Sequence, residues 1–303
     1  MTSEITLFVN PSAGRGRGAR AAGPAAGALR AAGFDVREVV GADAADALAG
    51  ARAAVAGGTR ALVAVGGDGL VSLALQAVAG TGTPLGVVAV GTGNDFARVN
   101  GLPVRDPAAA GAVVAAALSA GRTRSLDLGR VEGGPGGPGA PRWFGTVLAS
   151  GFDSRVNDRG NRMRFPGGRF RYDVAMLAEL AALRPIRYTV AFDDTDEREL
   201  EATLVAVGNG SSYGGGMRIC TDARMDDGLF DVCVVGPCSR TTLLRVFPRV
   251  YRGTHPGHPV VTVHRAARVR LSAEGVTGYA DGEPIGPLPL TAATVPGALR
   301  LLV

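Results

Sequence analysis

The pattern of apolar and polar positions divides the chain into two parts with different expected secondary structure. Up to about residue 120, short apolar runs alternate with longer segments whose apolar residues recur at helical spacing. The pattern predicts strands over residues 5–9, 34–40, 61–65 and 84–90, and helices over residues 19–32, 42–56, 71–79 and 107–120. Strands that alternate with helices are typical of a doubly wound, mainly parallel sheet with helices on both sides.

The second part of the chain is predicted to consist mostly of antiparallel strands. Its β-like segments are short and separated by turn residues, and they cover residues 186–192, 199–207, 229–235, 260–263, 269–272 and 298–303. Among residues 186–303, residues 240–251 form the one clear helical pattern. The glycine- and proline-rich residues 132–141 predict a flexible hairpin loop. We therefore predict an α/β domain over residues 1–125 and an antiparallel β-sandwich domain over residues 126–303.

Three polar turns rich in glycine follow the strands of the first part. They read Asn-Pro-Ser-Ala-Gly over residues 10–14, Gly-Gly-Asp-Gly over residues 66–69 and Gly-Thr-Gly-Asn-Asp over residues 91–95. Because the carboxyl ends of parallel strands meet at one edge of a sheet, we expect these turns to converge on a ligand. A glycine turn before a helix directs backbone N–H groups and the positive helix end at a phosphate.

Asp68 is the unexpected residue in the second turn. A carboxylate beside a phosphate would repel it, unless the carboxylate holds Mg²⁺ or acts on a proton during phosphoryl transfer. A simpler interpretation, that Asp68 caps the following helix, is equally favoured by the turn alone.

Composition narrows the classes of protein that fit. With 303 residues, 46% of them hydrophobic, the chain is long enough for two domains and a sizeable core. It has no apolar run near 18 residues and no signal-peptide pattern at its start, so we expect a cytoplasmic protein. Its three cysteines lack paired spacing, which argues against a disulfide framework or a zinc site. His255, His258 and His264 are interpreted as loop residues rather than metal ligands.

The charge of the chain comes from arginine alone. The formal net charge is +5, and none of the 32 basic residues is lysine. This excludes mechanisms that need a lysine, such as the Walker-type phosphate loop and the ion pair of protein kinases. The positive balance favours an anionic partner such as a nucleotide or an acidic lipid.

Taken together, the motifs resemble the diacylglycerol-kinase catalytic family, which includes bacterial lipid kinases and sphingosine and ceramide kinases. The three turns of the first part match in order and spacing. The second part adds Gly151-Phe152-Asp153, Gly208-Asn209-Gly210, Asp227-Gly228 and Asp281-Gly282-Glu283. The resemblance implies a nucleotide-binding domain similar to that of NAD kinases, a β-sandwich domain, and ATP with Mg²⁺ in the cleft between them.

The resemblance also implies roles for individual residues. The nucleotide would lie against Asn10, Pro11, Ser12, Ala13, Gly14, Gly66, Gly67, Asp68, Gly69, Thr92, Asn94 and Asp95. Glu283 corresponds to the general base, with Asp281 beside it and Asp68 across the cleft. Without the family, the Asp281-Gly282 pair favours an ordinary hairpin turn.

A structural Mg²⁺ is implied in the second domain. Its ligands would be the Asp227 carboxylate and the backbone carbonyls of Arg224 and Leu229, since Mg²⁺ prefers oxygen ligands. A turn with Asp227 exposed to solvent fits the same sequence.

Four positions depart from the family pattern. Leu70, Ser72 and Leu73 stand where the family usually has threonine, asparagine and glutamate, and Gly41 stands where it tends to offer a threonine. These changes leave Asp68 in place but put catalytic efficiency and the choice of substrate or nucleotide in question.

A basic segment indicates a contact with membrane. It holds Arg155, Arg159, Arg162, Arg164, Arg169 and Arg171, interleaved with aromatic residues. Such a surface could contact anionic headgroups at the inner membrane face, or it could be a solvated helical face. No pattern typical of nucleic-acid binding accompanies the charge.

The sequence thus predicts a lipid kinase that transfers the γ-phosphoryl group of ATP to diacylglycerol or a related alcohol. Two alternatives remain open: a kinase of the same fold acting on a soluble alcohol or NAD, and a nucleotide-binding regulator without catalysis. A homodimer is also left open.

Overall fold

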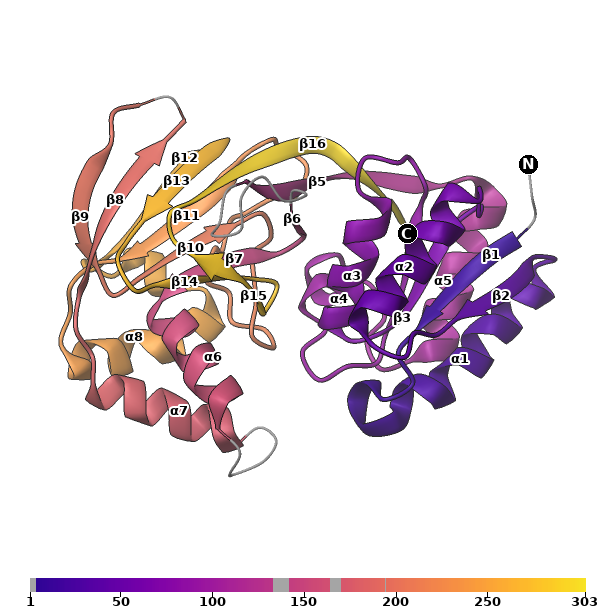
Figure 1. Ribbon diagram of the computed structural model, residues 1–303, viewed down its shortest axis with the longest axis horizontal. Helices are drawn as coiled ribbons and strands as arrows, with labels where there is room; N and C mark the ends of the chain where they lie inside the picture. Colours follow the sequence, from indigo (N-terminus) through magenta and orange to yellow (C-terminus); the bar gives the residue numbers. More distant parts are fainter. Residues whose placement is uncertain (1–3, 133–141, 164–169, 194) are drawn as a thin grey trace.

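A computed structural model describes residues 4–132, 142–163, 170–193 and 195–303. Figure 1 shows two halves side by side, with the N-terminal residues in one and most of the later residues in the other. The predicted hairpin loop lies outside the described residues, except for Glu132. Arg164 and Arg169 of the basic segment also lie outside them.

The first half is a parallel sheet covered by helices on both faces. Its strands run in the order β2 (Asp35–Val39), β1 (Glu4–Val9), β3 (Leu62–Gly66) and β4 (Leu85–Ala89). The helices are α1 (Ala13–Ala31), α2 (Ala44–Ala56), α3 (Asp68–Val78), α4 (Asp95–Val99) and α5 (Pro107–Ala120). Strands β1, β3 and β4 are buried on both faces, with α2 and α3 packed on one face and α1 and α5 on the other. The predicted doubly wound fold is confirmed.

The second half is an antiparallel sandwich with a layer of helices on one side. One sheet has the order β12 (Val261–Ala266), β11 (Phe230–Val235), β10 (Leu204–Gly208), β7 (Val147–Gly151), β14 (Thr277–Ala280) and β15 (Glu283–Pro287). The facing strands are β5 (Thr123–Glu132), β6 (Arg142–Phe144), β8 (Ile186–Phe192), β9 (Arg198–Ala202), β13 (Arg268–Ser272) and β16 (Leu290–Leu302). Buried residues such as Tyr188, Val205 and Phe230 fill the space between the sheets.

Helices cover the outer face of the β10–β11 sheet. They are α6 (Phe152–Arg162), α7 (Phe170–Ala181) and α8 (Arg240–Arg252), followed by the short 3-10 helix η1 (His255–Gly257). Leu243, Val246 and Val250 of α8 pack on the sheet in one cluster with Ala206 and Cys233.

Two long strands join the halves. β5 and β16 pair antiparallel along most of their length, and the end of β16 also pairs in parallel with β4. Leu299 and Leu301 belong to the core of the first half, although they are near the end of the chain. The boundary after residue 125 stays a prediction, because β5 runs through it.

Two predicted elements differ from the structure. Residues 199–207 form two strands rather than one, because the chain passes from one sheet to the other at Thr203. There the Thr203 N–H donates to Val235 O at 2.7 Å and its hydroxyl to Gly236 O at 2.9 Å. Helix α1 begins at Ala13 rather than at residue 19, with left-handed residues at Gly14, Arg15 and Gly16 near its start.

The two later glycine turns touch each other without side chains between them. A Cβ atom on Gly91 would lie 2.5 Å from the Gly67 Cα and 3.0 Å from Asn94 Oδ1. The turns after β3 and β4 therefore fit together only if position 91 is glycine.

We expect Gly91→Ala to lower the free energy of unfolding by about 1–3 kcal/mol, since overpacking pushes the two turns apart. Chemical denaturation measures the change. Gly27→Ala is the matched control, because Gly27 is an exposed position in α1 and a Cβ there meets no atom of another part of the protein within 4 Å. That control should stabilise the protein by up to about 1 kcal/mol, and equal effects of the two substitutions would contradict the packing argument.

Candidate active site

The three glycine turns converge at one edge of the parallel sheet, as predicted. They follow β1, β3 and β4, which are neighbours in the sheet order. In the first turn, Asn10 Oδ1 accepts hydrogen bonds from the Ser12 N–H at 3.1 Å and the Ser12 hydroxyl at 2.8 Å. The Ala13 N–H donates to Asn10 O at 3.1 Å, and Pro11 and Ser12 are exposed. The Asn10 side chain thus shapes this turn.

The start of α1 brings an arginine over the turns. Gly14 has a φ of 59° and a Cβ there would lie 2.2 Å from Val90 O, so only glycine fits. Behind it, Arg17 Nη2 donates to Gly91 O at 3.2 Å, whereas Arg17 Nε is buried without a partner. A half-buried, partly unpaired guanidinium next to three glycine turns is suited to an anionic ligand. Sequence analysis did not single out Arg17.

Asp68 ties the second turn to the third. Its Oδ2 accepts a hydrogen bond from the Asn94 N–H at 2.6 Å, and its Oδ1 accepts one from the Phe96 N–H at 3.4 Å. The residue at the N-cap of α3 is Gly67, so the interpretation of Asp68 as that cap is wrong. Gly67 and Gly69 flank the carboxylate, and Gly66 ends β3. The carboxylate is half-buried at the positive end of α3.

Asn94 and Asp95 face inward, whereas Thr92 is exposed. Asn94 has a φ of 59°, and its Nδ2 donates to Gly91 O at 3.1 Å. Asp95 accepts hydrogen bonds from the Gly215 and Gly216 N–H groups at 2.7 and 2.8 Å. Burial raises the pKa of Asp95, and the charge of Asp68 adds to the shift. In this arrangement Asp95 holds the first half to a loop of the second.

Asp281 forms a turn and also contacts the short connection between β6 and β7. Asp281 and Gly282 have φ values of 50° and 83° and join β14 to β15, so the hairpin turn expected from the pair is present. The Asp281 carboxylate accepts hydrogen bonds from the Gly145 N–H at 2.7 Å, the Thr146 N–H at 2.8 Å and the Thr146 hydroxyl at 2.6 Å. Burial raises the pKa of Asp281, and the nearby charge of Asp68 raises it further. The turn is therefore fixed beside Asp68.

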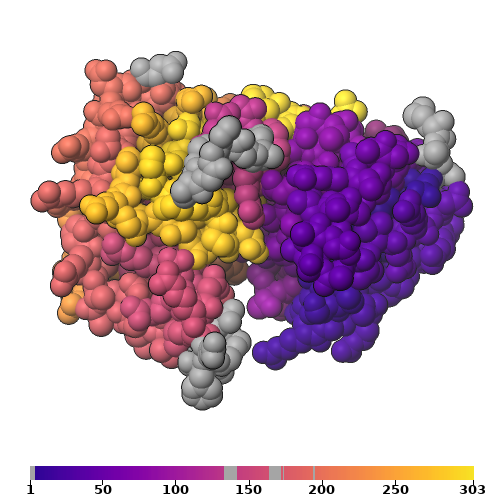
Figure 2. All heavy atoms as spheres, in the orientation of Figure 1, coloured from indigo at the N-terminus to yellow at the C-terminus, as the bar shows by residue number. Residues whose placement is uncertain are grey.

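Glu283 reaches across to the first half from the first position of β15. A Cβ atom on Gly69 would lie 3.3 Å from Glu283 Oε1. The carboxylate of Glu283 thus lies next to Gly69 at the start of α3, and Gly69 directly follows Asp68 in sequence. Figure 2 shows the surface hollowed between the two halves, on the side where α6 and α7 lie. Asp68, Asp281 and Glu283 come together where these halves meet.

Asp127 and Asn209 are further polar residues at the junction of the halves. Asp127 accepts hydrogen bonds from the Gly228 N–H at 2.7 Å and the Gly297 N–H at 2.9 Å. Asn209 Nδ2 donates to Asp127 O and Gly145 O, both at 2.9 Å, and its Oδ1 is buried without a partner. The Gly-Asn-Gly motif marked Asn209, but nothing in the sequence pattern marked Asp127.

The residues named for a structural Mg²⁺ belong to the loop that Asp127 holds through the Gly228 N–H and Met225 O. The Asp227 carboxylate pairs with Arg265 Nη2 and accepts a hydrogen bond from the Leu229 N–H at 3.2 Å. Arg224 pairs with Asp226 at 3.3 Å. Within the described residues, no three His, Cys, Asp or Glu side chains gather to hold a metal ion. A site with one carboxylate and two carbonyls at Asp227 stays a prediction, and Arg265 would compete for it.

The three histidines do not share a loop, contrary to the expectation. His255 is buried in η1, where its Nε2 lies 2.9 Å from Ile219 O. His258 follows η1, and His264 lies in β12, stacked on Phe192.

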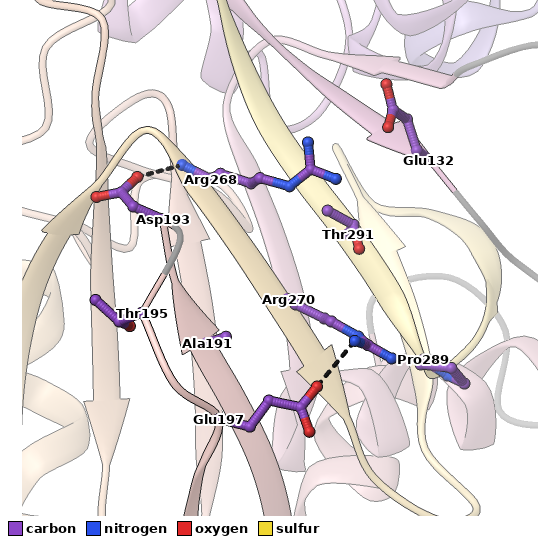
Figure 3. A pocket seen from close by; sticks show the side chains of 9 residues that line it. All are labelled: Glu132, Ala191, Asp193, Thr195, Glu197, Arg268, Arg270, Pro289 and Thr291. Atoms are coloured by element: carbon purple, nitrogen blue, oxygen red, sulfur yellow. Dashed lines mark hydrogen bonds and ion pairs between the residues drawn. The ribbon is translucent and has the colours of Figure 1, made fainter.

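A separate pocket of about 510 Å³ lies on the sandwich, lined by none of the predicted site residues. Figure 3 shows its charged residues. Arg270 Nη1 pairs with Glu197 at 2.8 Å, and Asp193 Oδ1 accepts from the Arg268 N–H at 2.9 Å. Because this pocket is lined neither by the three glycine turns nor by Asp68, Asp281 or Glu283, it is not the candidate for the chemistry.

Comparisons with known proteins agree with this geometry. Residues 4–131 match the family described as the diacylglycerol kinase catalytic domain, and residues 146–303 match the YegS C-terminal NAD kinase beta sandwich-like domain. The chain is 47% identical over 299 residues to a diacylglycerol kinase of Mycobacterium tuberculosis, covering 99% of this chain and 94% of the relative. The chain belongs to the diacylglycerol kinase family. It is a lipid kinase, as the motifs predicted.

More distant similarities to this kinase are found both in sequence and in fold. A diacylglycerol kinase of Bacillus subtilis is 28% identical over 68% of this chain and 64% of its own length. A crystal structure of a diacylglycerol kinase from Bacillus anthracis has a TM-score of 0.73 at 21% identity, covering 99% of this chain and 96% of the other. An NAD kinase from Archaeoglobus fulgidus in complex with ATP has a TM-score of 0.56 at 10% identity, covering 100% and 94%. These two solved structures confirm the predicted fold class.

The kinase has one more enclosed carboxylate, Asp153, which follows the start of α6. Tyr213 donates its hydroxyl hydrogen to Asp153 Oδ2, and Asp153 Oδ1 is buried without a partner. Burial raises the pKa of Asp153 to about 6. Because the folded protein binds this proton more tightly than the unfolded chain, Asp153 lowers the free energy of unfolding as the pH rises from about 4 to 6.

We expect Asp153→Asn to raise the free energy of unfolding at pH 7.5 by roughly 1–3 kcal/mol, since a neutral amide avoids the burial of charge. Denaturation between pH 4 and 8 should show the difference from the wild type growing up to about pH 6 and then levelling off. The exposed Asp226→Asn is the control and should change stability little. A difference that does not vary with pH would contradict the assignment.

Proposed function

We propose that this lipid kinase transfers the γ-phosphoryl group of ATP to a lipid hydroxyl, most simply that of diacylglycerol, and depends on Mg²⁺. The observation that supports this best is the position of Glu283 Oε1, 3.3 Å from a Cβ position on Gly69 at the start of α3. A carboxylate from one half thus faces the phosphate-type turns of the other. The Mycobacterium tuberculosis relative is named diacylglycerol kinase, which favours the same acceptor.

The nucleotide phosphates would lie against the three turns. Backbone N–H groups at the start of α3 and the guanidinium of Arg17 supply positive charge there. Gly67 and Gly91 allow the turns after β3 and β4 to pack directly against each other, which brings their backbone groups together at the proposed phosphate site. Thr92 is exposed beside them. Asn94 and Asp95 are buried, and they form hydrogen bonds with Gly91 and with Gly215.

The carboxylates of this site fit a magnesium ion. Asp68, Asp281 and Glu283 present the oxygen ligands that Mg²⁺ prefers. Burial raises the pKa of Asp281, and the nearby charge of Asp68 adds to the shift. Mg²⁺ usually binds one or two carboxylates together with phosphate oxygens, so a protein cage of three is not required. When bound, the ion would neutralise charge on the phosphates.

Glu283 is proposed as the general base. Its carboxylate removes the proton of the acceptor hydroxyl while that oxygen forms a bond to the γ-phosphorus. The bond from the γ-phosphorus to the bridging oxygen breaks, and ADP leaves with the electron pair. Asp281 orients Glu283, because its carboxylate is held by Gly145 and Thr146 and fixes the hairpin turn that precedes Glu283.

The basic segment and the oligomeric state stay predictions. On α6, Arg159 pairs with Glu179 at 2.5 Å and Arg162 with Asp158 at 3.8 Å, so part of this charge is neutralised within the protein. No helix among the described residues has the length and apolar character needed to cross a membrane. Contact of the segment with an anionic inner membrane face and formation of a homodimer are parts of the proposal.

A panel of acceptors tests the proposal. Labelled ATP with Mg²⁺ is offered with diacylglycerol, sphingosine, glycerol and NAD, and products are separated by chromatography. We expect transfer to diacylglycerol and loss of transfer when EDTA removes Mg²⁺. Transfer only to glycerol or NAD would support a kinase for soluble alcohols instead. Measurable ATP binding without transfer to any acceptor would support a regulatory protein.

The two acidic positions are distinguished by substitution. We expect Glu283→Gln to lower kcat by about 10²–10⁴-fold with little change in ATP affinity, because Glu283 acts on the acceptor. Asp68→Asn should impair both kcat and nucleotide binding, since it lies at the phosphate turns. The exposed Glu274→Gln is the control. Near-native turnover of Glu283→Gln would show that Glu283 is not the base.

A further inference from the structure

Helix α8 exposes apolar side chains on the side opposite its buried face. Leu243, Val246 and Val250 pack on the sheet. Leu244 and Tyr251 have exposed fractions of 54% and 46%, and Pro248 between them is also exposed. Positions 244, 248 and 251 are four and three residues apart, so they form one stripe along the helix.

A second exposed stripe on α8 is purely basic. Arg245, Arg249 and Arg252 repeat at the same spacing next to the apolar stripe, and α8 contains no acidic residue. None of the three has an ion-pair partner among the residues that the structure describes. This differs from α6, where Arg159 and Arg162 face carboxylates.

The segment of sequence that contains α8 is rich in arginine, and only the arginines on β12 and β13, Arg265 and Arg270, pair with carboxylates among the described residues. From residue 232 to residue 273 there are seven arginines and no aspartate or glutamate. The remainder of the chain has 25 basic and 27 acidic residues, and is therefore slightly negative. Such an asymmetry indicates a surface that meets an anionic partner.

The position of α8 suits a flat partner. Arg240 Nη2 donates to Ala181 O, which joins the start of α8 to the end of α7. Figure 1 shows α6, α7 and α8 as one layer along the lower side of the second half. α7 also exposes Val174 and Leu177. The hollow between the halves opens on the same side in Figure 2.

We propose that the exposed face of α8 docks on an anionic phospholipid bilayer, an inference that rests on the proposed function as a lipid kinase. Leu244, Pro248 and Tyr251 enter the boundary between headgroups and acyl chains, as in interfacial amphipathic helices. The arginines lie beside them and extend their charged ends to the lipid phosphates. Binding of a nucleic acid would leave the apolar stripe in water, so a bilayer accounts for both stripes.

Vesicle cosedimentation tests the proposal. Wild-type protein is mixed with vesicles of phosphatidylcholine alone or with added phosphatidylglycerol, at low and high salt. We expect strong binding only to the mixed vesicles, weakened by salt. R245Q/R249Q/R252Q should bind them roughly 100-fold more weakly, and L244S/Y251S at least about 10-fold more weakly.

R30Q/R37Q/R52Q is the matched control, because it removes the same charge from exposed positions on α1, β2 and α2 at the far end of the molecule. It should bind mixed vesicles like the wild type. Equal losses in the control and the α8 variant would overturn the proposal, as would equal binding to neutral vesicles. Loss of binding in R155Q/R159Q/R162Q but not in the α8 variants would also overturn it, in favour of α6. Thermal unfolding verifies that every variant is folded.

Activity separates this inference from the proposed function. The α8 variants should phosphorylate a short-chain, water-dispersed diacylglycerol at the wild-type rate and lose activity only on diacylglycerol within anionic vesicles. If the wild type phosphorylates neither form, the proposed acceptor is wrong, while the sedimentation result still decides whether α8 docks. Equal loss on both forms would show that α8 acts on the site and not through docking.

Discussion

The antiparallel pairing of β5 with β16 is the constraint on which the rest of the structure depends. These strands cross from one half to the other, so their register determines how the two halves face each other. Asp127 of β5 accepts hydrogen bonds from Gly228 and Gly297 and thereby fixes the crossing. Asp95 adds a second attachment through Gly215 and Gly216. A cleft built between separate domains on a loose linker would lack this fixed geometry.

This fixed junction brings negative charges together. Burial raises the pKa of both Asp95 and Asp281, and the charge of Asp68 adds to both shifts, although those two residues come from different halves. Hydrogen bonds from backbone N–H groups compensate part of the cost, and a bound cation would compensate more. In this chain without lysine, Arg17 is the cation at the glycine turns. Its Nη2 donates to Gly91 O, and its Nε is buried without a partner. The candidate site therefore has a basic end at Arg17 and an acidic end at Asp68, Asp281 and Glu283, an arrangement that is consistent with the proposed binding of phosphates and a cation.

Most of the first half could be predicted from sequence because each element there has a local signal. Apolar runs gave the strands, and the order of strands and helices implied that the glycine turns meet at one edge. The second half depends on contacts distant in sequence. No local pattern shows that the chain changes sheets at Thr203, or that Leu299 and Leu301 return to the first core. The assignment of Asn94 and Asp95 as nucleotide contacts stays a prediction. Both residues are buried and hydrogen-bonded to neighbouring turns, and the sequence alone does not show which polar side chains face a cleft. At Asp281 the sequence left two interpretations open, an ordinary hairpin turn and a site residue. In the structure Asp281 lies in a hairpin turn and also beside Asp68, so the two interpretations do not exclude each other.

The departures from the family pattern lie in the packing beneath the turns. Leu70 is buried in the first core, and a Cβ on Gly66 would lie 2.8 Å from its Cδ2, so this leucine fills the space under the turn. Ser72 is buried and Leu73 packs against the same cluster. At Gly41, a Cβ would lie 2.2 Å from Ala47 N, which excludes the threonine of other members without movement of α2. Leu70, Leu73 and Gly41 cannot supply polar side chains to the proposed reaction. In this chain Asp68, Glu283 and the backbone remain as the polar groups of the candidate site. Because those groups remain together at the junction, the substitutions favour a change in efficiency over a loss of the chemistry.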